Sequence, residues 1–257
     1  GLFGDPERIT KVLTDTVAQL GPGSAADTFQ GPIESITSNR GTAGVMFFVG
    51  LALSLWSASG YVGAFSRAQN VIYEAPEGRP FWKLRPLQML VTLVVVLLLA
   101  AVALSLVLTG PVVDAVAEPI GLSSTAVDAW DVAKWPVLAA VTLLIFAILY
   151  YTTPNVKLRG FRFITPGSLV AIVVWLAASA GFALYVSQFG SYDKTYGTLG
   201  GLVALLVWMW ISNLALLFGA ELNAERERDV QIRKGMPGAE KQIQLERRET
   251  PDRPTTA

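Results

Sequence analysis

The stretch 196–223, YGTLGGLVALLVWMWISNLALLFGAELN, decides the fold class of this chain. No charged residue occurs in 202–217, and a dense run of charges follows at 225–229. About 20 apolar residues at a rise of 1.5 Å per residue match a hydrocarbon layer roughly 30 Å thick. We therefore expect a membrane-spanning helix that ends where the charges begin.

Four more apolar runs precede this stretch, in a chain of 257 residues that is 52% hydrophobic and only 16% charged. The apolar residues are bunched into long runs instead of being spread at helical spacing, which favours a membrane protein over a large soluble core. We predict an all-α integral membrane protein with five transmembrane helices in this chain. The expected spans are about 44–65, 87–109, 136–153, 167–189 and 199–221.

The two ends of the chain are predicted to lie outside the membrane. In residues 1–43, Asp5-Pro6 is typical of a helix start, and Ile9, Leu13 and Val17 follow on one face. We expect short extracytoplasmic amphipathic helices there. Residues 224–257 are expected to continue the last helix for two or three turns and then form a charged cytoplasmic tail, whose end (PDRPTTA) is predicted to be disordered.

The distribution of basic residues predicts the orientation. Five spans place fifteen of the twenty lysines and arginines on one side of the membrane, and the acidic residues divide evenly. A Lys/Arg bias of this kind sets topology, so we expect a multi-pass protein of a bacterial inner membrane with a cytoplasmic C-terminus. An odd number of spans would then leave Gly1 outside, which predicts a further membrane helix upstream of it.

The inventory of reactive groups argues against most catalytic functions. The chain has no histidine and no cysteine, and its carboxylates are not clustered at metal-ligand spacing, so we expect neither an enzyme nor a metal ion or cofactor. The spans carry no ionisable residue in their interiors. Glu221, at the end of the last span, is either a stop signal or a functional carboxylate, and Asn213 either bonds a neighbouring helix or binds a polar headgroup.

Small and hydroxyl residues recur on the first, fourth and fifth expected spans. Ala177 and Gly181 have the small-xxx-small spacing that is typical of close helix packing, and Gly197 and Gly201 repeat it. Such faces are expected to pack helices together or to line a groove.

Several short motifs resemble the YihY/BrkB family of bacterial inner-membrane proteins, once labelled ribonuclease BN. The similarity covers roughly residues 40–230. It rests on the motifs NVIY (70–73), YY with PN (150–155), FITPG (163–167), Tyr185 with Phe189, SY with YG (191–197) and, most distinctive, LFGAELN (217–223). The resemblance implies a six-helix membrane fold whose first helix would lie upstream of Gly1.

Members of this family are commonly suspected of moving lipids or other amphiphiles, and the resemblance implies the same role here. The candidate substrate-binding residues are Asn70, Tyr73, Asn155, Tyr185, Tyr196, Gly197, Asn213, Glu221 and Asn223. The expected partners are membrane lipids and a small amphiphilic substrate, without nucleic acid, and the small-residue faces are compatible with a homo-oligomer. The alternatives are a membrane-bound nuclease or lipid-modifying enzyme, using Glu221, Asp128 and Asp131, and a non-catalytic scaffold.

The predicted orientation can be tested directly because the chain has no cysteine of its own. We expect a single cysteine at Asp128→Cys to react with a membrane-impermeant maleimide in intact cells. A single cysteine at Lys157→Cys should react only after the cells are permeabilised. The opposite labelling pattern would invert the predicted topology.

Overall fold

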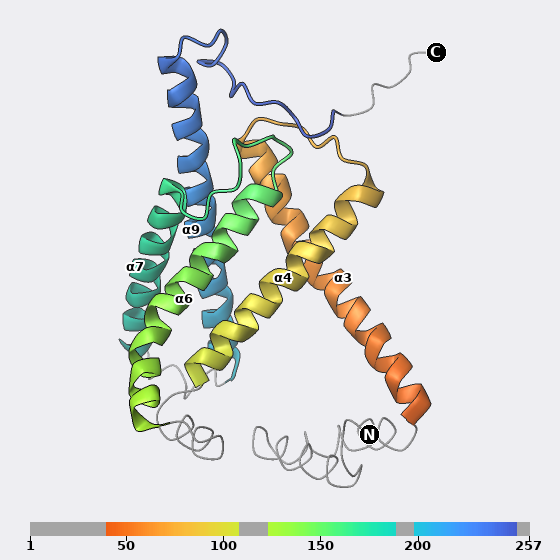
Figure 1. Cartoon of the computed structure of the whole chain (residues 1–257), viewed down its shortest axis with the longest axis vertical. Helices are drawn as coiled ribbons and strands as arrows, with labels where there is room; N and C mark the ends of the chain where they lie inside the picture. The colour runs from red at the N-terminus through yellow and green to blue at the C-terminus, as the bar shows by residue number, and fades with distance from the viewer. Residues whose placement is uncertain (1–39, 108–122, 189–197, 251–257) are drawn as a thin grey trace. The chain divides into compact units, whose positions relative to one another are not determined.

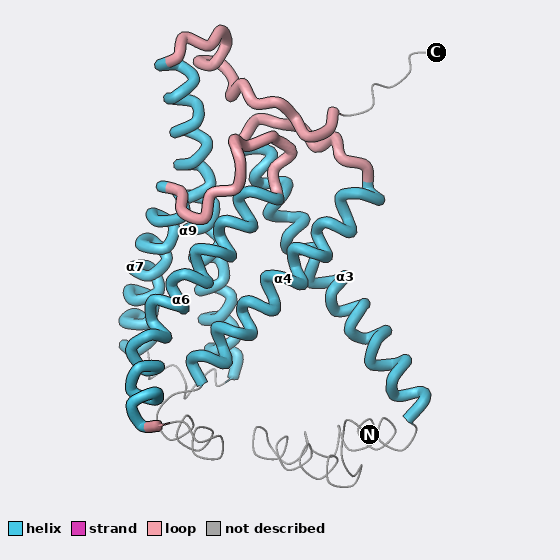
Figure 2. The backbone as a smooth tube through the Cα atoms, viewed as in Figure 1, coloured by secondary structure: helices cyan, strands magenta, loops and turns pink. Residues whose placement is uncertain are grey.

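A computed structural model describes residues 40–107, 123–188 and 198–250, and these residues contain five long helices (Figures 1 and 2). All five helices are long and apolar enough to cross a membrane, which confirms the predicted all-α fold class. The helices are α3 (Arg40–Ile72), α4 (Phe81–Val107), α6 (Ser124–Thr152), α7 (Pro166–Gln188) and α9 (Thr198–Arg233). Of the segment 1–43, in which amphipathic helices are expected, residues 1–39 lie outside the described residues and 40–43 belong to α3; the disorder expected at 251–257 also lies outside them.

The chain divides into two compact units, residues 1–57 and 58–257. In the first unit the structure describes the helical residues 40–57, and most of the large apolar side chains from Val45 to Trp56 are exposed. The second unit holds the rest of α3 and the other four helices, and all of the following concerns this unit.

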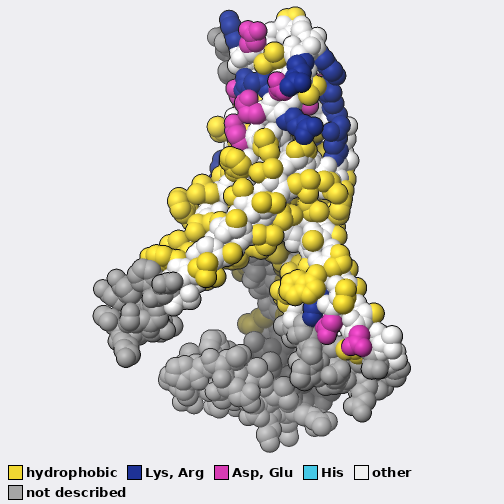
Figure 3. Space-filling view, turned by 90° about the vertical axis from the view of Figure 1, so that its left-hand side faces the viewer, with side chains coloured by type: hydrophobic (Ala, Val, Ile, Leu, Met, Phe, Trp, Pro, Cys, Tyr) yellow, Lys and Arg dark blue, Asp and Glu magenta, His cyan; other side chains and the backbone are white. Residues whose placement is uncertain are grey.

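Successive helices run in opposite directions. The helices α3, α6 and α9 end on the same side of the unit on which α4 and α7 begin (Figure 2). We call this side the basic end; it consists of the connections 73–80 and 153–165 together with residues 234–250. Lysines and arginines gather there, with apolar side chains over the neighbouring part of the bundle (Figure 3).

A small buried core joins all five helices near the basic end. It is formed by Val62, Phe65, Val91, Ile145, Phe146, Leu149, Tyr150, Ala171 and Ala220. Phe65 of α3 stacks on Tyr150 of α6, with ring centroids 6.4 Å apart. Most other large apolar side chains of the helices face outward, and this is the arrangement expected of a bundle whose surroundings are lipid.

The helices α7 and α9 make the most extensive helix pair, and their backbones meet at two glycines. A methyl group added to Gly167 would overlap the carbonyl oxygen of Gly219, and one added to Gly219 would overlap that of Gly167. By contrast, Gly181, Gly200 and Gly201 face open space within this chain. The small-xxx-small spacing of Ala177 and Gly181 in α7 therefore does not mark the close approach to α9. That approach occurs at Gly167, at the start of α7.

Reciprocal hydrogen bonds extend the α7–α9 contact into the apolar part of the bundle. The Trp175 indole donates to the Ser212 hydroxyl at 2.9 Å, and the Trp208 indole donates to the Ser179 hydroxyl at 3.1 Å. The two indole rings lie 6.2 Å apart. These serines, which were candidates for lining a groove, serve to join two helices.

The helices are longer than the apolar runs alone indicated. The third begins at Ser124 instead of near residue 136, because the charged turn before Pro136 stays helical. Within that turn Lys134 and Asp131 form an ion pair at 2.8 Å, which neutralises the buried ammonium group. The last helix continues to Arg233, as the expected two or three extra turns require.

Residues 234–250, which we call the strap, cross the basic end as an ordered segment. Ile243 is buried in a second apolar cluster with Tyr73, Ala75, Val156 and Ala224. Val156 and Arg247 form an isolated antiparallel bridge, in which the Lys157 amide donates to the Glu246 carbonyl at 2.7 Å. Composition alone predicted only a charged tail here, because a few apolar residues scattered among charges are a weak signal.

Asn155 ties the strap to both loops and is fully buried. Its side-chain amide donates to the carbonyls of Pro76 (2.9 Å) and Glu249 (2.8 Å), and its side-chain oxygen accepts from the Glu249 amide at 3.1 Å. Its own backbone amide donates to the Asn70 side-chain oxygen at 2.7 Å. One side chain therefore satisfies backbone groups of two segments that are distant in sequence.

Arg79 satisfies the carboxyl end of α6 in the same region. Its guanidinium donates to the carbonyls of Thr152 and Thr153 and forms an ion pair with Glu77 at 2.7 Å. A cation at this position also complements the helix dipole. Burial raises the pKa of the Glu77 carboxyl, but hydrogen bonds from Arg79 and Asn70 outweigh burial and leave that pKa below its usual value.

The glycine crossing predicts an asymmetric response to alanine substitution. We expect Gly219→Ala to lower thermal stability by about 1–3 kcal/mol, because the new methyl group must separate α7 from α9. The matched control is Gly181→Ala on α7, which faces open space and should be neutral or slightly stabilising. Equal melting temperatures for the two variants in detergent would contradict the close approach.

The strap predicts a protease phenotype. We expect Asn155→Ala to expose the strap to trypsin at Arg247 and Arg248, because each backbone group left without its partner costs about 1–3 kcal/mol. Gln242→Ala, which removes one exposed hydrogen bond to the Glu74 carbonyl, is the control and should leave the digestion rate near that of the original chain. Equal digestion rates for Asn155→Ala and the control would show that Asn155 does not hold the strap.

Candidate functional site

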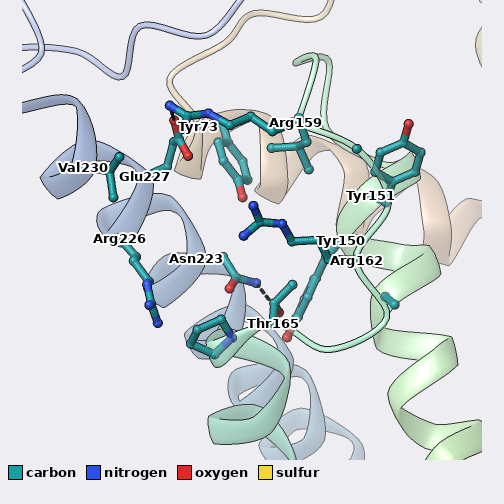
Figure 4. Close-up of a pocket in the computed structure, with 14 residues that line it drawn as sticks. Tyr73, Tyr150, Tyr151, Arg159, Arg162, Thr165, Asn223, Arg226, Glu227 and Val230 are labelled. Atoms are coloured by element: carbon teal, nitrogen blue, oxygen red, sulfur yellow. Dashed lines mark hydrogen bonds and ion pairs between the residues drawn. The ribbon is translucent and has the colours of Figure 1, made fainter. Parts of the chain in front are cut away.

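A cavity of about 290 Å³ lies at the basic end between α6, α7, α9 and the loop 153–165 (Figure 4). Its lining combines aromatic rings, three arginines and small polar groups. The lining residues are Tyr73, Ala147, Tyr150, Tyr151, Leu158, Arg159, Gly160, Arg162, Thr165, Pro166, Asn223, Arg226, Glu227 and Val230. The lining therefore combines apolar surface with an excess of positive charge, and we call its three arginines the rim.

One face of α9 supplies a wall of the cavity. Asn223, Arg226, Glu227 and Val230 follow each other at spacings of three, one and three residues, which places them on the same side of a helix. The same face includes Gly219, one turn earlier, where α9 meets α7. The glycine crossing therefore sets the distance at which this wall stands from the first turn of α7.

Asn223 connects that wall to the start of α7. Its side-chain oxygen accepts from the Gly167 amide at 3.0 Å, and its side-chain nitrogen donates to the Thr165 hydroxyl at 3.1 Å. The first amides of a helix have no partner within the helix, so this amide side chain satisfies one of them. Thr165 and Ser168 cap the same turn through reciprocal hydrogen bonds.

The loop 153–165 brings two arginines to the cavity. Gly160 adopts a φ of +111°, which a residue with a side chain rarely adopts, and this turn carries the chain from Arg159 round to Arg162. Arg159 is paired with Glu227 at 3.0 Å. In Figure 4 the Arg162 side chain extends toward Tyr73 and Asn223.

The rim carries excess positive charge. Three arginines face one glutamate, and Glu227 is already engaged by Arg159. Within the described part of the chain, neither Arg162 nor Arg226 takes part in an ion pair. The cavity is thus suited to a ligand with negative charge.

The side chain of Tyr73 lines the same cavity, and its hydroxyl points toward Arg162 (Figure 4). The residue is 4% exposed, its ring packs in the apolar cluster with Ile243, and its hydroxyl has no hydrogen-bond partner among the described residues. Burial, followed by the negative charges of Glu227 and Glu221, raises the pKa of Tyr73 above its ordinary value. The phenol therefore remains a neutral hydrogen-bond donor at physiological pH.

The structure separates the predicted site residues into distinct places. Tyr73 and Asn223 meet at the cavity, whereas Asn70 and Asn155 are structural members of the strap junction. Asn213 accepts from the Tyr61 hydroxyl at 2.6 Å and so bonds a neighbouring helix. Glu221 and Tyr185 are exposed and do not line the cavity, and Tyr196 and Gly197 lie outside the described residues.

Sequence reasoning missed the three arginines as site residues. Arg159, Arg162 and Arg226 were interpreted only as charges that set topology, because a local pattern does not reveal that two distant segments converge. The spacing of Asn223, Arg226, Glu227 and Val230 was the one signal that could have found this face of α9. Among the residues that the structure describes, no three acidic side chains gather as they would around a metal ion.

Comparison with known proteins gives one family. The family model described as "Virulence factor BrkB" matches residues 1–243. A Bacillus subtilis protein, YfkH, whose name calls it ribonuclease-like, is 33% identical over 84% of this chain and 77% of its own length. No solved structure matches the chain.

Other relatives carry the name "UPF0761 membrane protein". The one from Alteromonas mediterranea is 30% identical over 72% of this chain, and the one from Rhodospirillum centenum is 29% identical over 78% of it. The matched regions are 61% and 42% of those relatives' lengths, so this chain spans only part of them. Five helices of this chain are long and apolar enough to span a membrane, and the family model covers nearly the whole chain. This is therefore an integral membrane protein that belongs to the BrkB family.

Proposed function

We propose that this protein moves a lipid or another amphiphilic small molecule within or across the membrane, and that its basic end faces the cytoplasm. The observation that carries the proposal is the cavity itself, which lies at the basic end next to the apolar helices and has both apolar and charged lining. An amphiphile needs these two environments side by side. The Lys/Arg bias supports the orientation.

The cavity is small for a complete lipid but adequate for a headgroup. At about 290 Å³ it lies at the lower end of the range for small-molecule sites. The outward-facing apolar side chains of the helices would leave acyl chains in the bilayer while the headgroup occupies the protein. This division of the ligand requires no continuous apolar tunnel through the bundle.

We propose a non-enzymatic role in spite of the ribonuclease-like name of YfkH. The carboxylates that a membrane-bound enzyme would use do not lie together. Asp131 is near the start of α6, whereas Glu221 lies on α9 close to the opposite end of α6, which lines the cavity. Some 20 helical residues, about 30 Å, separate Asp131 from that end of α6. Arrangements of this kind do not supply the clustered acids of metal-assisted phosphodiester cleavage.

The proposal predicts transport by the purified protein. We expect vesicles that contain the full chain to move fluorescently labelled phospholipids between leaflets faster than empty vesicles do. Ala147→Leu should slow this movement severalfold, because Ala147 is 2% exposed and lines the cavity, which the larger side chain would partly fill.

The control for this experiment is Ala140→Leu, two turns earlier on α6 and exposed outside the cavity. Its transport rate should equal that of the original chain, and both variants should be compared at equal reconstituted amount and known melting temperature. Movement at the empty-vesicle rate for the original chain would refute lipid movement, and unchanged movement in Ala147→Leu would refute a role for the cavity.

A further inference from the structure

We propose that the cavity binds the phosphate group of an anionic amphiphile, with Arg162 as the cationic partner and the Tyr73 hydroxyl as a neutral donor. This inference rests on the proposed function, since it names the substrate class of the same site. The geometry behind it is the meeting of the loop 153–165 with one face of α9.

The first argument is the uncompensated charge. Arg159 has a partner in Glu227 at 3.0 Å, but Arg162 and Arg226 have no carboxylate partner among the described residues. Arg162 is exposed, and its side chain extends toward Tyr73 and Asn223 of the lining (Figure 4). Guanidinium groups offer several N–H donors in a plane, which suits the oxygens of a phosphate group.

The second argument is the Tyr73 hydroxyl, which is independent of the arginines. Tyr73 as a whole is only 4% exposed, its hydroxyl makes no hydrogen bond within the described residues, and the residue lines the cavity, so the hydroxyl can donate to a ligand there. The side chain is aimed at the space in which Arg162 lies (Figure 4). A phosphate oxygen placed there would accept from both groups.

The third argument places the ligand in the headgroup layer. Arg162 is flanked by Phe161 and Phe163, which are 49% and 40% exposed, and Ile164 beside them is 54% exposed. Aromatic residues next to arginines at the end of a membrane helix are typical of the interface between headgroups and acyl chains. A phosphate that enters from this side would therefore arrive with its acyl chains still in the bilayer.

The topology rule alone accounts for basic residues at this end but not for their arrangement. Arg67, at the basic end of α3, is exposed and lies outside the cavity. It would serve orientation as well as Arg162 does. This difference supplies the matched control, because Arg67→Gln and Arg162→Gln remove the same charge from the same end of the bundle.

The test measures binding, separately from transport. The full chain in neutral detergent is titrated with dioctanoyl phosphatidic acid, with dioctanoylglycerol as the phosphate-free probe and with inorganic phosphate alone, and thermal stabilisation is recorded. We expect saturable stabilisation by the phosphatidic acid and none by dioctanoylglycerol. Arg162→Gln should weaken the binding at least tenfold and Tyr73→Phe severalfold, whereas Arg67→Gln should stay within twofold.

Inorganic phosphate distinguishes the source of the group. If phosphatidic acid binds at least tenfold more tightly than inorganic phosphate, the ligand is a lipid headgroup; if the two bind alike, each depending on Arg162, the site takes phosphate without chains. Binding that is equal in Arg162→Gln and the original chain, or equal for dioctanoylglycerol, would overturn the proposal. Arg162-dependent binding without lipid movement in vesicles would instead refute transport and leave the phosphate site standing.

Discussion

The close approach of two helix backbones at Gly167 and Gly219 is the constraint on which the basic end depends. Neither position tolerates a β-carbon without moving the other helix, so the two segments are held at a fixed separation. One turn beyond Gly219, Asn223 is then near enough to accept from the Gly167 amide at 3.0 Å. A lipid-facing helix pair gains little from the hydrophobic effect, so such close packing and its hydrogen bonds must supply much of the association.

That contact also explains how a polar cavity can exist at the edge of an apolar bundle. Asn223 satisfies the first turn of α7, Arg79 satisfies the last carbonyls of α6, and Asn155 satisfies the loops and the strap. Because these backbone groups are paired within the protein, the arginines of the rim are not required as their partners. Arg162 lines the cavity and forms no ion pair within the described residues, so it is available for a ligand.

The helical membrane fold could be predicted from the sequence because lipid imposes a simple length requirement on apolar runs. The motifs at 163–167 and 217–223 also pointed to the right places, since they contain Gly167, Gly219 and Asn223. Spacing failed where the partner was unknown, as for Gly181, which faces open space within this chain. The strap and the arginine rim were not predicted, because their contacts join segments more than 60 residues apart and no local period records them.

Tyr73 contacts the strap and also lines the cavity. The wall of the cavity therefore depends on segments that are distant in sequence. The Tyr73 ring packs against Ile243 of the strap and Val156 of the loop, while the same residue lines the cavity. Glu74, the next residue, has a φ of 53° and is held in this left-handed conformation by Arg228 at 2.8 Å and by the Ile243 amide at 3.0 Å. The chain direction after α3, and with it the position of the phenol, is therefore fixed by α9 and the strap together. A charged segment that composition marks as a tail thus becomes part of the support of the candidate binding site.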